Sequence, residues 1–384
     1  MIEPSSFFDL LAAEGVDFVA GVPDSLLKEA CRYAAAVLPA EGHVITANEG
    51  TAVGLAVGHH LATGAVPLVY LQNSGIGNTV NPLLSLVDPE VYAVPLILLI
   101  GWRGEPGIKD EPQHVKQGRV TTGLLDIMEI PYRVLDGAQR EGLEAVRWAV
   151  REAQMRAGPV ALLVRKGAFS KARVPDGRQG APAQPPVLRR EDAIERVVAA
   201  ADPESVIVAS TGMIARELYE YRRRVGDDGS RDFLTVGAMG HASQIALGIA
   251  RARPEKPVVC LDGDGAAIMH LGGLATIGTS RVPKYLHVVL NNGAHDSVGG
   301  QPTAGFDIDF GAIAHACGYV EAVKAVGDLD AVGTFVRSLQ ATTGPAFLEV
   351  RVATGSRPDL GRPKETPVEN KRAFVDRISM VCGH

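Results

Sequence analysis

The hydrophobic positions of this chain fall into two alternating patterns. Short runs of branched apolar residues, bounded by turn residues, alternate with longer stretches in which apolar residues recur at helical spacing. This alternation is typical of parallel sheets whose strands are connected by helices, and it predicts an α/β fold. Strands are predicted at residues 16–20, 43–47, 66–71, 94–100, 132–134, 160–164, 206–209, 233–236, 257–261, 286–290, 319–323 and 347–351. Helices are predicted from a cap at Ser5 or Ser6 to residue 13, and at residues 26–36, 51–61, 140–157, 191–201, 214–223, 242–250, 266–277 and 310–317.

Polar residues at the ends of two of these strands indicate a binding site. Gly263-Asp264-Gly265 follows the strand at 257–261, and Asn291-Asn292 follows the strand at 286–290. Because parallel strands open at the same sheet edge, Asp264 and Asn292 are expected to lie side by side beneath a helix N-terminus. Oxygen ligands suit Mg²⁺ or Ca²⁺, and exposed N–H groups at a helix start suit a phosphate. The stretch predicts a site for a metal diphosphate, and the alternative is a structural glycine turn beside a chance pair of asparagines.

The two halves of the chain look like divergent copies of one layout. Glu49 and Ser74 are 25 positions apart in the first half, as are Met239 and Asp264 in the second. One copy holds an acid where the other holds a methionine, and one holds a candidate metal ligand where the other does not. Taken alone, Glu49 would be an acid that complements a helix dipole. The repeat favours a functional role for it instead.

Length and composition limit the class of protein. The 384 residues suit two domains, which we place at residues 1–168 and 189–384, with a proline- and glycine-rich linker at 169–188. A net charge of −6 without a basic block argues against nucleic acid as a partner. The four scattered cysteines are typical of reduced thiols, and the start of the chain lacks the pattern of a signal peptide. The apolar run around residues 91–100 is too short for a membrane span, so we expect a soluble cytoplasmic protein without membrane partners.

The two polar strand ends carry a resemblance to a known family. Gly263-Asp264-Gly265 followed by Asn291-Asn292 resembles the signature of enzymes that use thiamin diphosphate, such as decarboxylases and acetolactate synthases. The resemblance implies that Asp264, Asn292 and the backbone carbonyl of Ala294 bind Mg²⁺. It also implies two similar parallel-sheet domains, a pyrimidine-binding domain at 1–168 and a diphosphate-binding domain at 189–384. The chain leaves no room for the middle domain of three-domain relatives.

The same resemblance implies roles around the cofactor. Glu49 would contact N1′ of the aminopyrimidine as the activating acid, Met239 would support the bent cofactor from beneath, and the Gly237 carbonyl would accept from the 4′-amino group. An ordinary core methionine is the alternative for Met239. The glycine turn after the strand at 206–209 predicts further diphosphate contacts. Cofactor contacts are thus expected at Glu49, Ser210, Thr211, Gly212, Gly237, Met239, Gly263, Asp264, Gly265, Ala266 and Asn292.

Candidates for substrate contact lie in loops at the predicted carboxyl edges of the strands. A long polar loop is predicted at residues 102–119, with a plain solvated loop as the alternative. His114 is its predicted acid/base residue, and Arg103 and Lys109 are candidate partners for an anion. Several other candidates equally suit helix capping, with Ser25 as a possible N-cap of the helix at 26–36. These others are Asp24, Ser25, Asn73 and Asn78. His295 and Ser297, in the glycine-rich segment after Asn292, could also reach the substrate.

Four longer segments resemble the phosphonopyruvate decarboxylases, with the sulfopyruvate decarboxylases close by. They are Gly21-Val22-Pro23-Asp24-Ser25, Gly101-Trp102-Arg103-Gly104, Asp110-Glu111-Pro112-Gln113-His114 and the glycine-rich segment from Asn292 to Gln301. The resemblance implies non-oxidative decarboxylation of 3-phosphonopyruvate to phosphonoacetaldehyde and CO₂, in phosphonate and antibiotic biosynthesis. It further implies a homodimer or larger assembly with active sites at the interface. The alternatives are decarboxylation of sulfopyruvate or another 2-oxo acid, a non-catalytic thiamin diphosphate-binding protein, and a nucleotide-binding protein.

Overall fold

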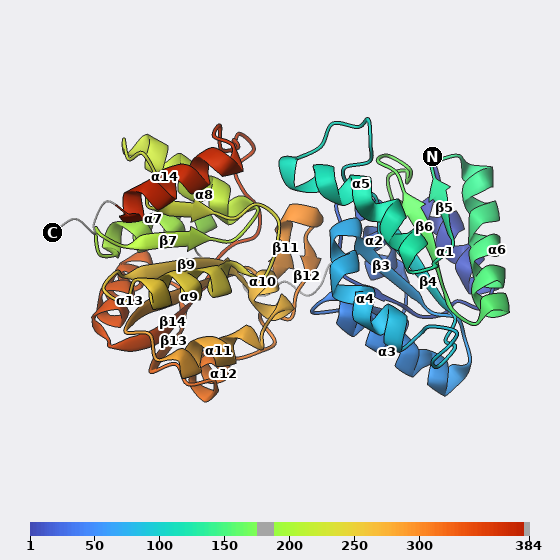
Figure 1. Cartoon of the computed structure of the whole chain (residues 1–384), viewed down its shortest axis with the longest axis horizontal. Helices are drawn as coiled ribbons and strands as arrows, with labels where there is room; N and C mark the ends of the chain where they lie inside the picture. The colour runs from blue at the N-terminus through green and yellow to red at the C-terminus, as the bar shows by residue number, and fades with distance from the viewer. Residues whose placement is uncertain (175–187, 380–384) are drawn as a thin grey trace. The chain divides into compact units, whose positions relative to one another are not determined.

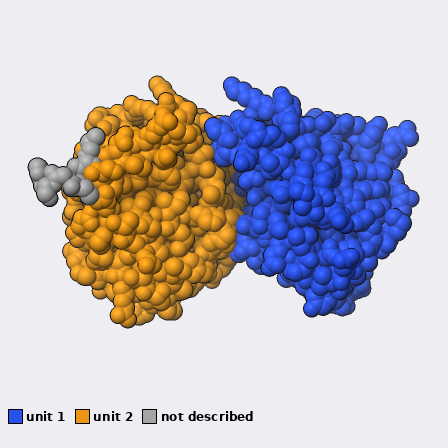
Figure 2. All heavy atoms as spheres, in the orientation of Figure 1, with its two compact units in different colours: residues 1–181, 298–301 blue, residues 182–297, 302–384 orange. Residues whose placement is uncertain are grey.

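A computed structural model describes residues 1–174 and 188–379 of the chain. These residues form two compact units (Figure 2). Unit 1 contains residues 1–174 and 298–301, and unit 2 contains residues 188–297 and 302–379. Most of the predicted linker at 169–188 lies outside the described residues.

Unit 1 is built on a sheet of six parallel strands in the order β2-β1-β3-β4-β6-β5 (Figure 1). Its central strands read as near-continuous apolar runs because a parallel sheet is covered on both faces. The strands are β1 (Val19–Gly21), β2 (His43–Ile45), β3 (Leu68–Gln72), β4 (Leu96–Gly101), β5 (Tyr132–Leu135) and β6 (Pro159–Val164).

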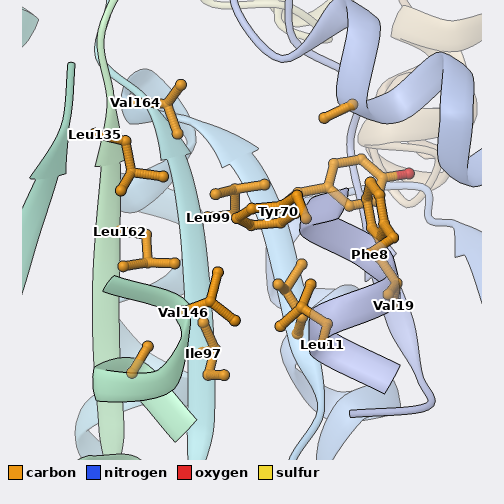
Figure 3. Close-up of a cluster of buried hydrophobic side chains, with 14 of the residues drawn as sticks. Phe8, Leu11, Val19, Tyr70, Ile97, Leu99, Leu135, Val146, Leu162 and Val164 are labelled. Carbon is orange, nitrogen blue, oxygen red and sulfur yellow. The ribbon is translucent and has the colours of Figure 1, made fainter. Parts of the chain in front are cut away.

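Two layers of helices cover this sheet, and each layer has its own apolar cluster. Along β4, Ile97 and Leu99 face one cluster while Leu98 and Ile100 face the other, as the two-residue period of a strand requires. Figure 3 shows the first cluster, in which Phe8, Leu11 and Val146 pack against strand residues. The first layer is α1 (Pro4–Ala13), α2 (Lys28–Val37) and α6 (Gln139–Arg156), and the second is α3 (Glu49–Thr63), α4 (Ile76–Ser85) and α5 (Pro112–Ile127).

Unit 2 has a second six-stranded parallel sheet in the order β13-β14-β10-β9-β7-β8. Its strands are β7 (Val206–Ala209), β8 (Asp232–Leu234), β9 (Val258–Gly263), β10 (Lys284–Asn291), β13 (Glu321–Val326) and β14 (Gly344–Arg351). One face is covered by α7 (Arg190–Ala200), α8 (Met213–Arg224) and α13 (Leu329–Ala341). The other is covered by α9 (Ala242–Ala252), α10 (Asp264–Met269), α11 (Gly273–Ser280), α12 (Phe310–Ala316) and α14 (Pro367–Ser379). The segment after β10 carries the short elements β11 (Ala294–His295), η2 (Asp296–Val298) and β12 (Gln301–Pro302).

The two sheets have the same topology. When the strands of each large sheet are numbered along the chain, both sheets have the order 2-1-3-4-6-5. The prediction of two similar parallel-sheet domains is confirmed, and all the predicted strands overlap strands of these sheets. Among the described residues, no helix is long and apolar enough to cross a membrane.

Several helix predictions were wrong in detail. The helix predicted at 266–277 is two helices, α10 and α11, because the backbone leaves the helical conformation at His270. The loop predicted at 102–119 ends at residue 111, because α5 begins at Pro112. A proline in the first turn is a typical helix start, but the polar residues around Pro112 resemble a loop in composition.

The predicted serine caps were also wrong. Helix α1 begins at Pro4, so neither Ser5 nor Ser6 is its cap. Helix α2 begins only at Lys28, so Leu27 and not Ser25 occupies its N-cap position. Helices α13 and α14 were not predicted at all.

Candidate active site

The candidate metal site of unit 2 lies where β7, β9 and β10 end. The strand order reverses direction between β7 and β9, and such a switch point opens a crevice at the carboxyl ends of the strands. The turn after β7 contains Ser210, Thr211 and Gly212, the turn after β9 contains Asp264, and β10 ends at Asn291. The fold therefore brings the residues that were predicted to hold a metal diphosphate to one edge of one sheet.

Asp264 is the centre of this site. It is the first residue of α10 and only 2% exposed. Its Oδ1 accepts from the backbone N–H of Asn292 at 3.5 Å, and its Oδ2 accepts from the hydroxyl of Thr303. Burial raises the pKa of Asp264 to about 6, against the opposing effect of these hydrogen bonds. A buried carboxylate with so little compensation fits a role as the ligand of a cation.

The two neighbouring asparagines have different surroundings. Asn291 donates its amide to the carbonyl of Gly305 at 2.6 Å and to Glu349 at 2.8 Å, so it anchors the end of β10 to the sheet. Asn292 contacts Asp264 through its backbone N–H, which donates to the carboxylate. The side-chain Oδ1 of Asn292 accepts from the N–H of Ala294 at 3.0 Å. Asp264, Asn292 and Ala294, the predicted metal ligands, therefore lie within one connected cluster.

Backbone conformation shapes the rest of the unit 2 site. Gly212 has a φ of +99°, which a residue with a side chain rarely adopts, and it precedes α8. The Thr211 hydroxyl accepts from the N–H of Gly237 at 3.1 Å, so the β7 turn holds the segment that carries Met239. Within that segment Gly237 and Ala238 have φ values of 73° and 46°. The predicted contacts at Ser210, Thr211, Gly212, Gly237 and Met239 thus belong to two joined turns, and each role stays a prediction.

The other predicted residues of this edge lie close to α10. A Cβ added to Gly265 would lie 3.0 Å from Cε1 of His295, so this glycine lets the histidine approach the helix start. Burial lowers the pKa of His295 to about 4, and its imidazole is therefore neutral near pH 7. Gly263 and Ala266 flank the same turn, and Ser297 is exposed in the segment after β10.

Glu49 occupies a buried position at the start of α3 in unit 1. It is 5% exposed, and burial raises the pKa of its carboxyl group. Its Oε2 accepts from the amide of Asn78 at 2.7 Å. A Cβ on Gly75 would lie 2.3 Å from its Oε1, so the glycine makes room for the carboxylate. Asn78 thus positions the carboxylate of Glu49. The contact of Asn78 with the substrate stays a prediction.

We predict that Gly75→Ala lowers activity by roughly 10²-fold, because an added methyl group displaces the Glu49 carboxylate by about an ångström. The backbone of Gly75 is right-handed, so the variant should fold. Steady-state kinetics and thermal unfolding of the same samples measure both effects. Gly77→Ala is the matched control, since a Cβ there would contact nothing within 4 Å. Equal activity of the two variants would contradict this role of Gly75.

Arg103 is held by its own loop. Its Nε donates to Asp110 Oδ2 at 2.8 Å and its NH2 donates to Asp110 Oδ1 at 2.5 Å, a bidentate pair. Its NH1 donates to the hydroxyl of Ser25 at 2.7 Å. Ser25, predicted as a possible cap, is therefore a partner of Arg103, while Lys109 is exposed.

Asn73 has a positioning role in the same region. Its Oδ1 accepts from the N–H of Arg103 at 3.1 Å, and its Nδ2 donates to the Arg103 carbonyl at 2.8 Å and to Thr121 at 2.9 Å. Both ends of the amide are thus used within the protein. The predicted substrate contact of Asn73 stays untested, and the hydrogen bonds show that it fixes the loop that carries Arg103.

Asp24 and His114 are buried titratable side chains that lie close enough to Arg103 to feel its charge. Asp24 is fully buried, and its Oδ2 accepts from the N–H groups of Leu26 and Leu27. Its Oδ1 has no hydrogen-bond partner within residues 1–174 and 188–379. Burial raises the pKa of Asp24 to about 6, although the charge of Arg103 opposes the shift. Burial and the charge of Arg103 lower the pKa of His114 to about 4. The imidazole of His114 is therefore neutral near pH 7. It has a single ring N–H that could donate a proton.

The prediction from the sequence missed three polar residues of these sites. Thr303 is bonded to Asp264, Asp110 is bonded to Arg103, and Asp296 is bonded to Asn292. Asp110 and Asp296 stand in the segments that resemble known decarboxylases, but nothing in their spacing showed what they contact. Thr303 lies 39 positions after Asp264, and only the fold brings the two together.

Comparison with known proteins agrees with this geometry. The model of the thiamine pyrophosphate enzyme N-terminal TPP binding domain matches residues 5–129, and that of the C-terminal TPP binding domain matches residues 210–350. This fold and this site therefore define a thiamine pyrophosphate enzyme. The chain is 37% identical to the phosphonopyruvate decarboxylase of Streptomyces viridochromogenes over 95% of its own length and 92% of the relative's. It belongs to the family of the phosphonopyruvate decarboxylases.

Two further relatives show how far the likeness extends. The phosphonopyruvate decarboxylase of Streptomyces hygroscopicus is 37% identical over 97% of this chain and 93% of its own. The sulfopyruvate decarboxylase of Methanosarcina acetivorans is 27% identical over 97% of this chain and 96% of its own. Both alignments extend over nearly the full length of this chain and of the relative, so neither leaves room for a third domain between the two cofactor-binding domains.

Proposed function

We propose that this protein decarboxylates 3-phosphonopyruvate to phosphonoacetaldehyde and CO₂ with thiamin diphosphate and Mg²⁺. The observation that carries the proposal is the likeness to phosphonopyruvate decarboxylases, at 37% identity along nearly the whole chain. The domain boundaries that we propose are 1–168 for pyrimidine binding and 189–384 for diphosphate binding, with the connection at 169–188. A cytoplasmic role in the biosynthesis of phosphonates, including antibiotic ones, suits this activity.

The residues of unit 2 suit the metal and the diphosphate. Asp264, Asn292 and the carbonyl of Ala294 supply oxygen donors only, and burial of the Asp264 carboxylate outweighs the hydrogen bonds that it accepts. The positive φ of Gly212 and the small side chains of the β7 turn leave room for phosphate oxygens beside the start of α8. These residues would bind Mg²⁺ and the diphosphate end of the cofactor.

The residues of unit 1 suit the chemistry at the ring end of the cofactor, opposite the diphosphate. When bound, thiamin diphosphate supplies a carbanion and an electron sink for loss of CO₂ from a 2-oxo acid. Glu49, whose pKa is raised by burial, holds a proton for a ring nitrogen. His114 and His295 are neutral and would donate a ring N–H toward the product. Asp24, Ser25, Arg103 and Lys109 remain candidates for the substrate, with Arg103 oriented by Asp110.

We further propose that two or more copies of the chain assemble. In this arrangement Glu49 of one protomer serves the metal site of another, so that the active sites lie at the interface. The duplicated topology supports the proposal, because each half holds one part of the chemistry: the acid in unit 1 and the metal ligands in unit 2.

The substrate is tested by comparing turnover of three 2-oxo acids at equal concentrations. We expect kcat/KM for phosphonopyruvate to exceed that for pyruvate by roughly 10³-fold or more, since a site built for a charged group rejects an analogue that lacks it. Release of CO₂ is measured with a coupled assay. Sulfopyruvate is the second candidate because of the likeness to the Methanosarcina acetivorans protein. Preference for sulfopyruvate would replace the proposed substrate, and preference for pyruvate would refute an anion-binding pocket.

A further inference from the structure

A partly buried chain of hydrogen bonds leads away from Asn292. Its Nδ2 donates to Oδ2 of Asp296 at 2.7 Å. The same oxygen accepts from NH1 of Arg190 at 2.8 Å and from the N–H of Gly355 at 2.9 Å. One carboxylate oxygen thus collects three donors, which come from three separate parts of unit 2.

Arg190 is itself fixed at its other end. Its Nε donates to Glu217 Oε2 at 2.8 Å, and its NH2 donates to Glu217 Oε1 at 3.0 Å. The side chain of Arg190 is 4% exposed and that of Glu217 is 2% exposed, so water does not compete for these bonds. A guanidinium held in a bidentate pair has a defined direction, and here its remaining nitrogen points at Asp296.

The chemistry of these groups settles which way the amide of Asn292 faces. A carboxylate only accepts and a guanidinium only donates. The end of the Asn292 amide that meets Asp296 must therefore be its NH₂ group, and its oxygen must face the opposite way. There Oδ1 accepts from the N–H of Ala294 at 3.0 Å, beside the backbone N–H of Asn292 that donates to Asp264. An amide turned by half a rotation would present two N–H donors to a cation instead of an oxygen.

We propose that Asp296, held by Arg190, is the positioning residue that directs the Asn292 oxygen toward the divalent cation and thereby sets the affinity for it. This inference rests on the proposed metal diphosphate site. Asp296 does not touch the cation; it acts through Asn292. Residues that orient metal ligands in this way commonly change metal affinity by roughly 10-fold to 100-fold when they are replaced.

The test uses the full-length protein and Asp296→Asn, a variant that keeps the shape of the side chain but can donate as well as accept. Mg²⁺ is titrated into protein with saturating thiamin diphosphate, and binding is followed by calorimetry. We expect the Kd for Mg²⁺ to rise by roughly 10-fold to 100-fold, with kcat largely recovered at saturating Mg²⁺. Thermal unfolding without Mg²⁺ should stay close to wild type. Asp307→Asn, an exposed aspartate later in the same segment, is the matched control and should leave the Kd unchanged.

The possible results separate the two proposals. If the wild-type protein binds thiamin diphosphate without any dependence on Mg²⁺, the proposed metal site fails. If the wild type depends on Mg²⁺ but Asp296→Asn has the Kd of Asp307→Asn, the positioning role fails and the metal site stands. Should Asp296→Asn not fold, Arg190→Lys keeps the charge but loses the forked geometry. In that variant an unchanged Kd for Mg²⁺ would overturn the inference, and a raised one would support it.

Discussion

Replacing Glu49 with Gln is expected to lower decarboxylation by about 10³-fold while the chain still folds. Glu49 is 5% exposed, burial raises the pKa of its carboxyl group, and Asn78 donates to one of the carboxyl oxygens. Glutamine keeps the size of the side chain but cannot release and recover a proton at the ring nitrogen of a cofactor, and loss of such a group typically costs 10²-fold to about 10⁴-fold. CO₂ release and circular dichroism of the same preparation measure both parts of the prediction.

The pH profile gives an independent check on this role. A raised pKa keeps Glu49 protonated to higher pH than an ordinary glutamate, so wild-type activity should fall as the pH rises through that value. The exposed Glu90 provides the control variant Glu90→Gln, which should match wild type. Full decarboxylation by Glu49→Gln would contradict the catalytic role of Glu49, whereas absence of CO₂ release from the wild type with every 2-oxo acid would support the alternative of a non-catalytic cofactor-binding protein.

Replacing Asp264 with Asn is expected to remove binding of thiamin diphosphate with Mg²⁺. The carboxylate is the one charged member of the predicted ligand set, and a neutral amide does not replace it for a divalent cation. Wild-type protein should be stabilised by about 4 kcal/mol when cofactor and metal are present at 1,000 times their Kd, and the variant should gain nothing. Differential scanning calorimetry with and without the two ligands measures this difference.

The same substitution should stabilise the protein when no ligand is added. Burial raises the pKa of Asp264 to about 6, so the folded protein holds this proton more tightly than the unfolded chain does. The resulting penalty is absent below about pH 4, grows as the pH rises, and is complete above pH 6, where it amounts to about 3 kcal/mol. Unfolding in denaturant at pH 8 should therefore show Asp264→Asn to be more stable than wild type, and equal stability would contradict the burial of an ionised carboxylate.

The two variants together test the proposed assembly. If Glu49 of one protomer serves the metal site of another, mixed dimers of Glu49→Gln and Asp264→Asn chains contain one intact site. Co-expression of the two inactive chains should then restore about a quarter of wild-type activity, as expected for random pairing in a two-fold dimer. An absence of restored activity in purified mixed dimers would place both groups of each site in the same chain.

Much of the fold could be predicted because parallel strands are short, apolar and punctuated by turns. The runs that became β9 and β10 were recognisable, and their order placed Asp264 beside Asn292. Helix ends were harder to predict. The N–H groups that a serine was expected to satisfy at the start of α2 are taken up in part by the buried side chain of Asp24. Helix α5 begins at a proline inside a polar segment that resembles a loop in composition.

The candidate site was predictable only where spacing along the chain reflects the fold. The repeat of 25 positions singled out Glu49, but Asn78 and Gly75, which hold and accommodate its carboxylate, gave no comparable signal. Arg103 was predicted as a partner of an anion, and the structure shows its guanidinium engaged by Asp110 and Ser25. A single sequence does not distinguish an arginine that binds a substrate from one that organises a loop, because both need the same residue.

Each unit buries its own hydrophobic clusters on both faces of its own sheet. Neither fold therefore needs the peptide connection to complete its core. The connection instead fixes the ratio of the two units, because every unit 1, which holds Glu49, is synthesised together with one unit 2, which holds Asp264. Assembly therefore does not depend on two separate chains being made in equal amounts.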